Sequence, residues 1–171
     1  AMSARARFSL IYLEAELAFQ AGQIELARRL LASMDDRSLS PVTKIWRDFK
    51  TAVSYMWEGR PALAEQAARP KHSEWEAEVG RRGQWTAMIG SVLAGACWQQ
   101  DMRSEAKALL AGRIDVIEQA VGYGGVFHAY RTLAQMAACE GDEARAFAYL
   151  EAMTAVGDAR GTVRTVANSL V

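Results

Sequence analysis

Apolar positions recur along the chain at helical spacing, and four times they follow the same order around a turn residue. In each set a small residue stands seven positions before the turn, an alanine five positions after it, and a mostly apolar residue four positions later. The sets are Ala15, Gly22, Ala27 and Leu31; Ala52, Gly59, Ala64 and Ala68; Ala94, Asp101, Ala106 and Leu110; and Ala134, Gly141, Ala146 and Leu150. Their turn residues stand 37, 42 and 40 positions apart, a spacing typical of stacked helical repeats. The pattern predicts an all-α chain of about four helical hairpins.

Capping and breaking residues predict where the hairpins begin and end. Ser40 followed by Pro41 predicts a helix start, because serine can cap free amide hydrogens and proline loses nothing at the first helical position. Pro70 predicts the end of the second hairpin. The expected hairpins cover residues 3–36, 41–70, 74–121 and 126–157, within a single domain over residues 1–171.

The third hairpin is the hardest to place. Ser73 with Glu76 resembles a capping box and predicts a helix over residues 74–100, with Gly80 and Gly83 as candidate interruptions. One long return helix is expected over residues 104–120. The glycines that follow, Gly122, Gly124 and Gly125, are expected to form a loop.

The two ends of the chain and one uncharged internal segment carry further expectations. A last helix over residues 160–171 has no return partner and either caps the array or belongs to a further repeat. Ala1 stands before Met2, so we expect the chain to be one piece of a larger protein. Residues 83–100 carry no charge but include polar side chains and glycines, and we expect a buried helix there rather than a membrane span.

Composition excludes several classes of function. Twenty basic and twenty acidic side chains give zero net charge, so the basic surface of a nucleic-acid reader or an anionic-membrane binder is missing. Cys97 and Cys139 have no close Cys or His partner in the sequence, which argues against a disulfide, a metal or another cofactor and favours the reducing cytoplasm. His128 has no nucleophile and carboxylate at a plausible spacing, and His72 is expected to be solvated in a connector. We expect no enzymatic activity.

One face of each outgoing helix, at positions 13, 10, 6 and 3 before the turn residue, is expected to line a concave surface. Aromatic rings with scattered polar groups on it would suit a sugar or a similar metabolite, or a protein partner. Packing between repeats is the alternative role, above all for Trp46, Phe49 and Trp98. The candidate binding residues are Tyr12, Glu16, Phe19, Trp46, Phe49, Met56, Met88, Trp98, His128, Arg131 and Gln135.

The offsets of the small residue, the turn glycine and the following alanine resemble those of tetratricopeptide repeats over nearly the whole chain. The repeats depart from that family in being longer than about 34 residues, in an inconsistent leading aromatic residue and in lacking the closing proline. The resemblance implies a right-handed α-solenoid of about four such hairpins plus a C-terminal helix.

Residues 100–165 resemble a narrower group, the helical region of maltose-regulator-type LuxR family activators. The likeness is carried by Glu105-Ala-Lys-Ala-Leu-Leu110, Ile117-Glu, Ala129-Tyr-Arg-Thr-Leu-Ala134, Gly141-Asp, residues 144–151, Arg160 and Arg164. It implies an effector-sensing and protein-assembly domain that self-associates or binds a protein and contacts neither DNA nor membrane. The alternative is a tetratricopeptide adaptor that holds a peptide or partner helix in its concave groove.

Overall fold

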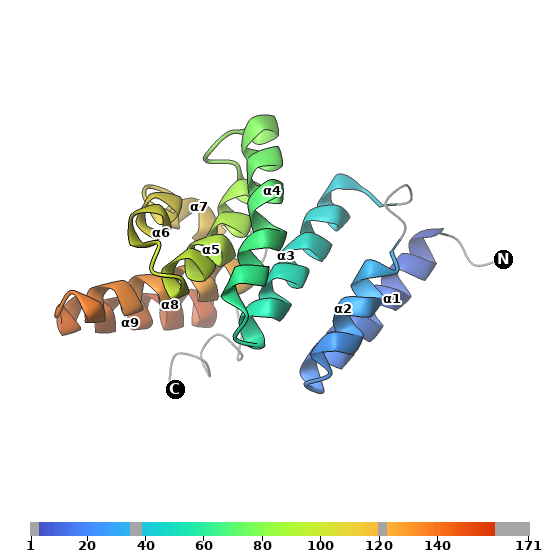
Figure 1. Cartoon of the computed structure of the whole chain (residues 1–171), viewed down its shortest axis with the longest axis horizontal. Helices are drawn as coiled ribbons and strands as arrows, with labels where there is room; N and C mark the ends of the chain where they lie inside the picture. Colours follow the sequence, from blue (N-terminus) through green and yellow to red (C-terminus); the bar gives the residue numbers. More distant parts are fainter. Residues whose placement is uncertain (1–3, 35–38, 120–122, 160–171) are drawn as a thin grey trace.

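The computed structural model describes residues 4–34, 39–119 and 123–159, and within these ranges the chain forms helices joined by turns, without a strand (Figure 1). The prediction of an all-α chain is confirmed. The helices are α1 (Ala4–Gln20), α2 (Ile24–Ala32), α3 (Pro41–Trp57), α4 (Pro61–Val79), α5 (Gln84–Gln99), α6 (Arg103–Leu110), α7 (Ile114–Gln119), α8 (Tyr123–Cys139) and α9 (Glu143–Ala159).

All four predicted turn residues adopt the left-handed backbone conformation that reverses the chain after a helix. Their φ angles are 74° at Gly22, 68° at Gly59, 61° at Asp101 and 78° at Gly141. In the first turn the amide of Gly22 donates to the carbonyl of Phe19 at 3.1 Å and the next amide, of Gln23, donates to Ala18 at 2.8 Å. The same pair of bonds closes the other three turns, so all four are Schellman turns.

The start of the second hairpin also follows the prediction. The hydroxyl of Ser40 accepts a hydrogen bond from the Thr43 amide at 3.3 Å, and Pro41 opens α3. These contacts satisfy local backbone groups, which is why they could be read from a few neighbouring residues.

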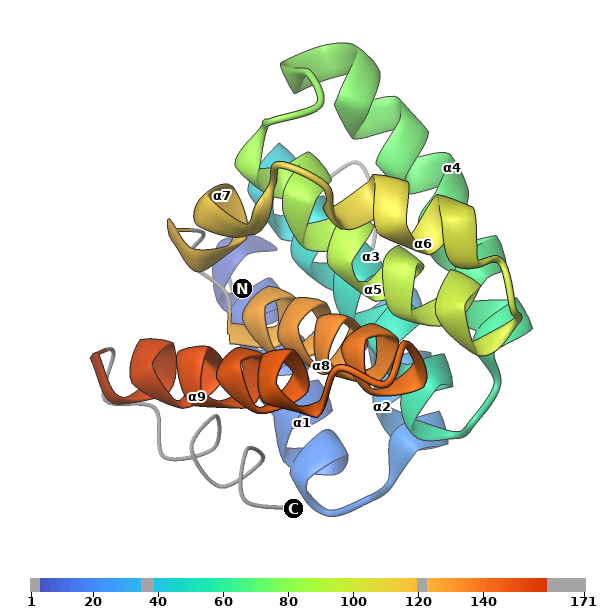
Figure 2. The same ribbon diagram turned by 90° about the vertical axis from the view of Figure 1, so that its left-hand side faces the viewer.

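Helix α5 lies at the centre of the fold. Every residue from position 86 to 97 is buried, and α5 packs against α3, α4, α6, α7 and α8 (Figure 2). The expectation of a buried helix over this uncharged segment is confirmed. Among the described residues, no helix is both long and apolar enough to cross a bilayer.

The predicted end of the second hairpin at Pro70 is wrong. Helix α4 continues through Pro70 to Val79. Proline removes one amide donor, but Pro70 and Gln66 both lie on the exposed side of the helix, where the freed carbonyl of Gln66 can reach water. Continuation also buries His72 and Trp75 on the face that carries Ala64 and Ala68. His72 is therefore inside a helix and 6% exposed, not in a solvated connector.

The third hairpin starts and returns differently from the prediction. Residues 74–79 belong to α4, the chain turns at Gly80 with φ of 78°, and α5 begins only at Gln84. The single return helix expected over residues 104–120 is divided into α6 and α7 at Gly112, whose φ is 67°. The break brings Arg113, 2% exposed, against α4.

The expected glycine loop is largely helix. Gly124 and Gly125 lie in the first turn of α8, while Gly122 and the terminal helix predicted over residues 160–171 fall outside the described residues. A Cβ atom at Gly124 would lie 2.6 Å from ring atoms of Phe49. The glycine therefore allows α8 to approach α3 closely.

The buried apolar side chains form two clusters rather than one. The smaller belongs to the first hairpin and contains Ala15, Ala18, Phe19, Ala27, Leu31 and Met34. The larger joins α3 to α9 around α5. Phe19 and Trp57 meet edge to face, with ring centroids 5.3 Å apart, at the boundary between the first and second hairpins.

Polar contacts at three hairpin junctions share one register. The residue six positions after one turn contacts the residue just before the next turn. The pairs are Arg28 with Glu58 at 3.0 Å, Glu65 with Gln100 at 2.8 Å and Lys107 with Glu140 at 2.5 Å. Phe147 holds the corresponding position in the fourth hairpin and is 64% exposed. The register repeats although the residue types change, so it was not visible as a sequence motif.

Two adjacent glycines give a matched test of the close approach of α8 to α3. We expect Gly124→Ala to lower the free energy of unfolding by about 1–3 kcal/mol, because the added methyl overlaps buried Phe49. Gly125→Ala meets its nearest atoms at 3.5 Å and should be neutral or stabilising by up to about 1 kcal/mol. Urea denaturation of both variants measures the difference, and equal effects would contradict the described approach.

The Arg28–Glu58 junction pair gives a second test. Two parallel hydrogen bonds of 3.0 Å join side chains that are 15% and 25% exposed. A double-mutant cycle to alanine should give a coupling energy of about 1 kcal/mol. The control is Arg29–Glu25, a 3.8 Å pair within α2 with side chains 70% and 75% exposed, which should give a coupling near zero. Equal coupling in both cycles would contradict a role for Arg28 in holding the hairpins together.

Candidate functional site

The residues predicted to line a concave surface divide by burial. Five are buried: Phe19, Phe49, Met56, Met88 and His128. Tyr12, Glu16, Trp46, Trp98 and Gln135 are half-buried, and Arg131 is exposed. The buried members pack inside the protein, so a ligand on this face would meet the half-buried ones. Binding by this set stays a prediction.

Several members of the set contact one another or a residue of a neighbouring hairpin. Phe49 meets Trp46 of the same helix and His128 of α8 edge to face, with centroid distances of 6.2 and 6.3 Å. Glu16 pairs with Lys50 of α3 at 2.7 Å, and burial, followed by the nearby Glu16 carboxylate, raises the pKa of Tyr12. These contacts are those of packing residues between repeats.

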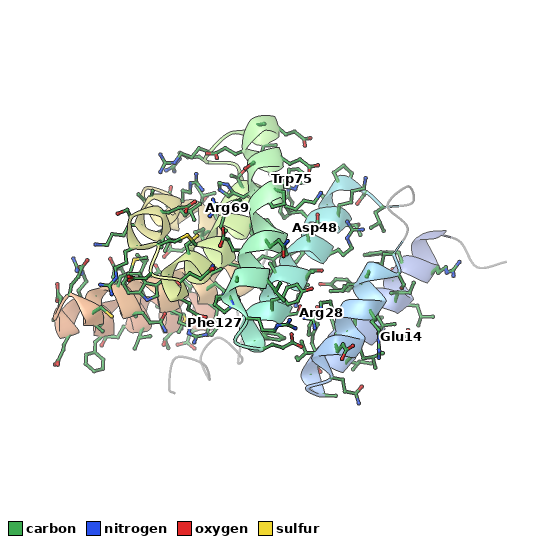
Figure 3. All side chains as sticks on the ribbon, in the orientation of Figure 1. Glu14, Arg28, Asp48, Arg69, Trp75 and Phe127 are labelled. Carbon is green, nitrogen blue, oxygen red and sulfur yellow. The ribbon has the colours of Figure 1, made fainter. Side chains whose placement is uncertain are left out.

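His128 is a buried neutral imidazole. It is 3% exposed, and its Nε2 has no hydrogen-bond partner among the described residues. Burial, and then the positive charges of Arg131 and Lys50, lower the pKa of His128 to about 3. Its ring lies edge-on to Phe127, labelled in Figure 3, with centroids 5.3 Å apart. The side chain therefore contributes packing and carries no charge near neutral pH.

A different group of charged residues lines a cleft of about 360 Å³ between α4 and the α6–α7 segment. Its lining comes from the second half of α4, the turn before α5, α5 itself, and α6 with the residue that precedes α7. The cleft is lined by Arg69, His72, Ser73, Glu76, Arg81, Leu93, Glu105, Ala108, Leu109 and Arg113. We name it the α4–α6 cleft.

The deepest charge in the α4–α6 cleft is the guanidinium of Arg113. Its Nη1 lies 2.9 Å from Nε2 of His72, and its Nη2 donates to Glu76 at 3.2 Å. Burial lowers the pKa of Arg113, and burial followed by the charge of Arg113 lowers the pKa of His72. The imidazole is thus kept neutral, and its Nε2 can accept the hydrogen bond from the guanidinium.

Gly90 of α5 makes room for this pair. A Cβ atom there would lie 3.1 Å from Nη1 of Arg113 and 3.3 Å from the His72 ring. A larger residue on α5 would press on both side chains. The absence of a side chain at Gly90 therefore leaves the space that Arg113 and His72 occupy.

Arg69 of α4, labelled in Figure 3, also lines the α4–α6 cleft. It donates to both oxygens of Glu105 at 2.5 and 3.1 Å and to Glu65 at 2.9 Å. The hydrogen bond from Arg69 lowers the pKa of Glu105. Burial raises the pKa of the nearby Cys97 thiol to about 11, so this cysteine remains protonated. The ion pair between Arg69 and Glu105 joins α4 to α6.

A second cleft, of about 380 Å³, lies between the α6–α7 turn and the fourth hairpin. Leu110, Ile114, Leu133 and Met136 contribute apolar walls, and its charged members meet at Glu140. Lys107 and then Arg145 lower the pKa of Glu140. These charges are already paired with each other, so this cleft offers a ligand mainly apolar contact.

Sequence reasoning missed the α4–α6 cleft for a definite reason. Arg113 was expected within one long return helix over residues 104–120, and His72 was expected in a solvated connector. The chain break at Gly112 and the continuation of α4 past Pro70 bring these residues together. Neither event has a distinct sequence signal.

Comparison of the chain with protein-family models, with curated proteins and with solved structures found no match.

The buried His128 predicts a pH dependence of stability. Its pKa is about 3 in the folded protein and about 6.5 when unfolded, so the unfolded chain binds the proton first as the pH falls. The contribution of neutral His128 to the free energy of unfolding is therefore present above about pH 6.5. It falls by about 2 kcal/mol between pH 7.5 and pH 5. We expect His128→Leu to remove this part of the loss while changing stability little at pH 7.5. Urea denaturation at both pH values checks it; an unchanged pH dependence in the variant would contradict the buried neutral state.

Proposed function

We propose that this chain is the non-catalytic effector-sensing and protein-assembly domain of a LuxR-family transcriptional regulator of the maltose-regulator type. In this proposal the hairpins form a right-handed α-solenoid of tetratricopeptide-like repeats, and the domain itself contacts neither DNA nor membrane. The four Schellman turns at the predicted positions support the repeat assignment. The observation that carries the sensing role is the α4–α6 cleft.

The position of the α4–α6 cleft suits a sensor because its walls come from two hairpins. Arg69, His72 and Glu76 belong to α4, whereas Glu105 and Leu109 belong to α6. A ligand that contacts both walls binds best when they stand at one particular separation. It would therefore favour one arrangement of the hairpins over others, which is how an effector shifts a population of conformations.

An apolar stripe on α1 supports the assembly role. Leu10, Leu13 and Leu17 fall on one face of the helix and are 48%, 59% and 63% exposed. Large apolar side chains grouped on a surface are typical of protein–protein contacts. In the proposal this face binds a neighbouring protein segment or a second copy of the chain.

The alternative is an adaptor that holds a peptide or partner helix without a small-molecule signal. Half-buried aromatic residues favour it: Trp46 lies beside Phe49, and the Arg103 guanidinium lies 5.3 Å from the centre of the Trp98 ring. Such rings are suitable contacts for an apolar peptide side chain.

A thermal-shift screen against small metabolites tests the sensing role. A true effector at ten times its dissociation constant should stabilise the domain by about 1.4 kcal/mol, or roughly 3–6 °C in Tm. Ala108→Trp should abolish the shift, since Ala108 is exposed and lines the α4–α6 cleft. Ala62→Trp, exposed on α4 outside the cleft, is the matched control and should leave it unchanged.

Other outcomes separate the alternatives. A shift that survives Ala108→Trp and disappears in Trp98→Ala places the ligand on the predicted concave surface. Absence of any shift, together with binding of a peptide that Trp98→Ala abolishes, selects the adaptor. The regulator assignment itself is checked in the gene, where a phosphate-binding ATPase motif upstream and a helix-turn-helix downstream are expected.

A further inference from the structure

We infer that the α4–α6 cleft binds a small organic monoanion, a carboxylate with a short apolar body. The inference rests on the proposed sensing function and specifies the chemistry of its effector. It is carried by the unequal charges of the residues lining the cleft and by a buried guanidinium whose donors are incompletely used.

Arg113 supplies the incompletely used donor. It is 2% exposed, its Nη1 and Nη2 contact His72 and Glu76, and its Nε has no hydrogen-bond partner among the described residues. A buried donor left without an acceptor destabilises the folded protein. A ligand oxygen placed against the guanidinium would offset part of that cost.

The lining charges leave a positive excess. Three arginines face two glutamates in the cleft, and His72 is neutral because burial and Arg113 lower its pKa. Arg69 and Arg113 each have a carboxylate partner within the cleft, Glu105 and Glu76 respectively. Arg69 also pairs with Glu65 outside the cleft. Arg81 is the lining arginine without a carboxylate partner among the described residues, which corresponds to a ligand with one negative charge.

Arg81 lies at the mouth of the cleft and has N–H donors available to a ligand. It is exposed, and both of its hydrogen bonds leave from Nη2, to the carbonyls of Ala108 at 2.9 Å and Ala111 at 3.3 Å. A guanidinium has five N–H donors in a planar fork that matches a carboxylate. Arg81 can keep its bonds to α6 and still bind an anion.

The remaining lining residues indicate the size and polarity of the rest of the ligand. Leu93, Leu109 and Ala108 form apolar wall, and the volume of about 360 Å³ is near the lower end for small-molecule sites. A cationic ligand would be repelled by Arg81, and a polyanion would bring more negative charge than the excess at the site. A compact monocarboxylate matches both the positive charge of Arg81 and the apolar walls of the cleft.

Three ligands of nearly equal shape test the charge requirement. Benzoate is the probe, benzamide its neutral counterpart and benzylamine its cationic counterpart, each measured by isothermal titration calorimetry on the whole chain. Benzoate should bind and the other two should not. Arg81→Gln should weaken benzoate binding by about tenfold, the equivalent of about 1.4 kcal/mol.

The neighbouring arginine provides the control. Arg82 is also exposed and also donates to a carbonyl of the α6–α7 segment, that of Gly112, but it does not line the cleft. Arg82→Gln should change benzoate affinity by less than about twofold, well under the effect of one charge-assisted hydrogen bond. Thermal melts of both variants verify that each is folded before its affinity is compared.

The inference is wrong if benzoate does not bind at about 10 mM, a concentration that saturates most of a millimolar site. It is also wrong if benzamide or benzylamine binds as well as benzoate, or if Arg81→Gln and Arg82→Gln lose the same affinity. A neutral metabolite whose stabilisation is blocked by Ala108→Trp would also overturn it while leaving the proposed sensing function intact. The sensing function fails separately, when no small molecule of any charge stabilises the domain in a way that Ala108→Trp blocks.

Discussion

The burial of α5 is the constraint on which the rest of the fold depends. Residues 86–97 are enclosed on every side by helices of three hairpins, and a helix in that position can carry no charge without a large desolvation cost. Its segment is accordingly uncharged and rich in glycine and alanine. Small side chains let neighbouring helices approach: a Cβ at Gly95 would lie 3.2 Å from Thr132 of α8. The second, third and fourth hairpins thus share one core, while the first keeps a cluster of its own.

Charges excluded from α5 are collected where hairpins meet, and this distribution creates the candidate site. Arg69, Glu105 and the Arg113–His72 pair all lie against α5 or beside it, bridging α4 to the α6–α7 segment. Arg113 and His72 are buried, and leaving a buried polar group without its partner is costly, so this pair holds α4 and the α6–α7 segment in a defined register. Arg81 lines the same cleft and has no carboxylate partner among the described residues. In the proposal, one hairpin junction thus combines side chains that hold α4 against α6 with an arginine that contacts the ligand.

Polar contacts in a shared register distinguish the junctions from the cores of the hairpins. Arg28 with Glu58, Glu65 with Gln100, and Lys107 with Glu140 connect successive hairpins at equivalent positions. Partly exposed polar pairs are weak compared with apolar burial. The second, third and fourth hairpins also share apolar packing around α5, so these polar pairs set the register of junctions whose stability comes mainly from the shared core.

The sequence by itself determined the helical class, the four turn positions, the Ser40–Pro41 helix start and the burial of the uncharged helix. Each depends on local physics: left-handed φ at a turn, a cap, a proline at the first helical position, or the cost of burying charge. Only the tertiary structure decided that α4 continues past Pro70, that the third return helix breaks at Gly112, and that Gly124 and Gly125 are helical. Those outcomes depend on what the continued or broken chain can bury against distant residues, His72 and Trp75 in one case and Phe49 in another. The α4–α6 cleft follows from the same long-range contacts, which is why no spacing in the chain indicated it.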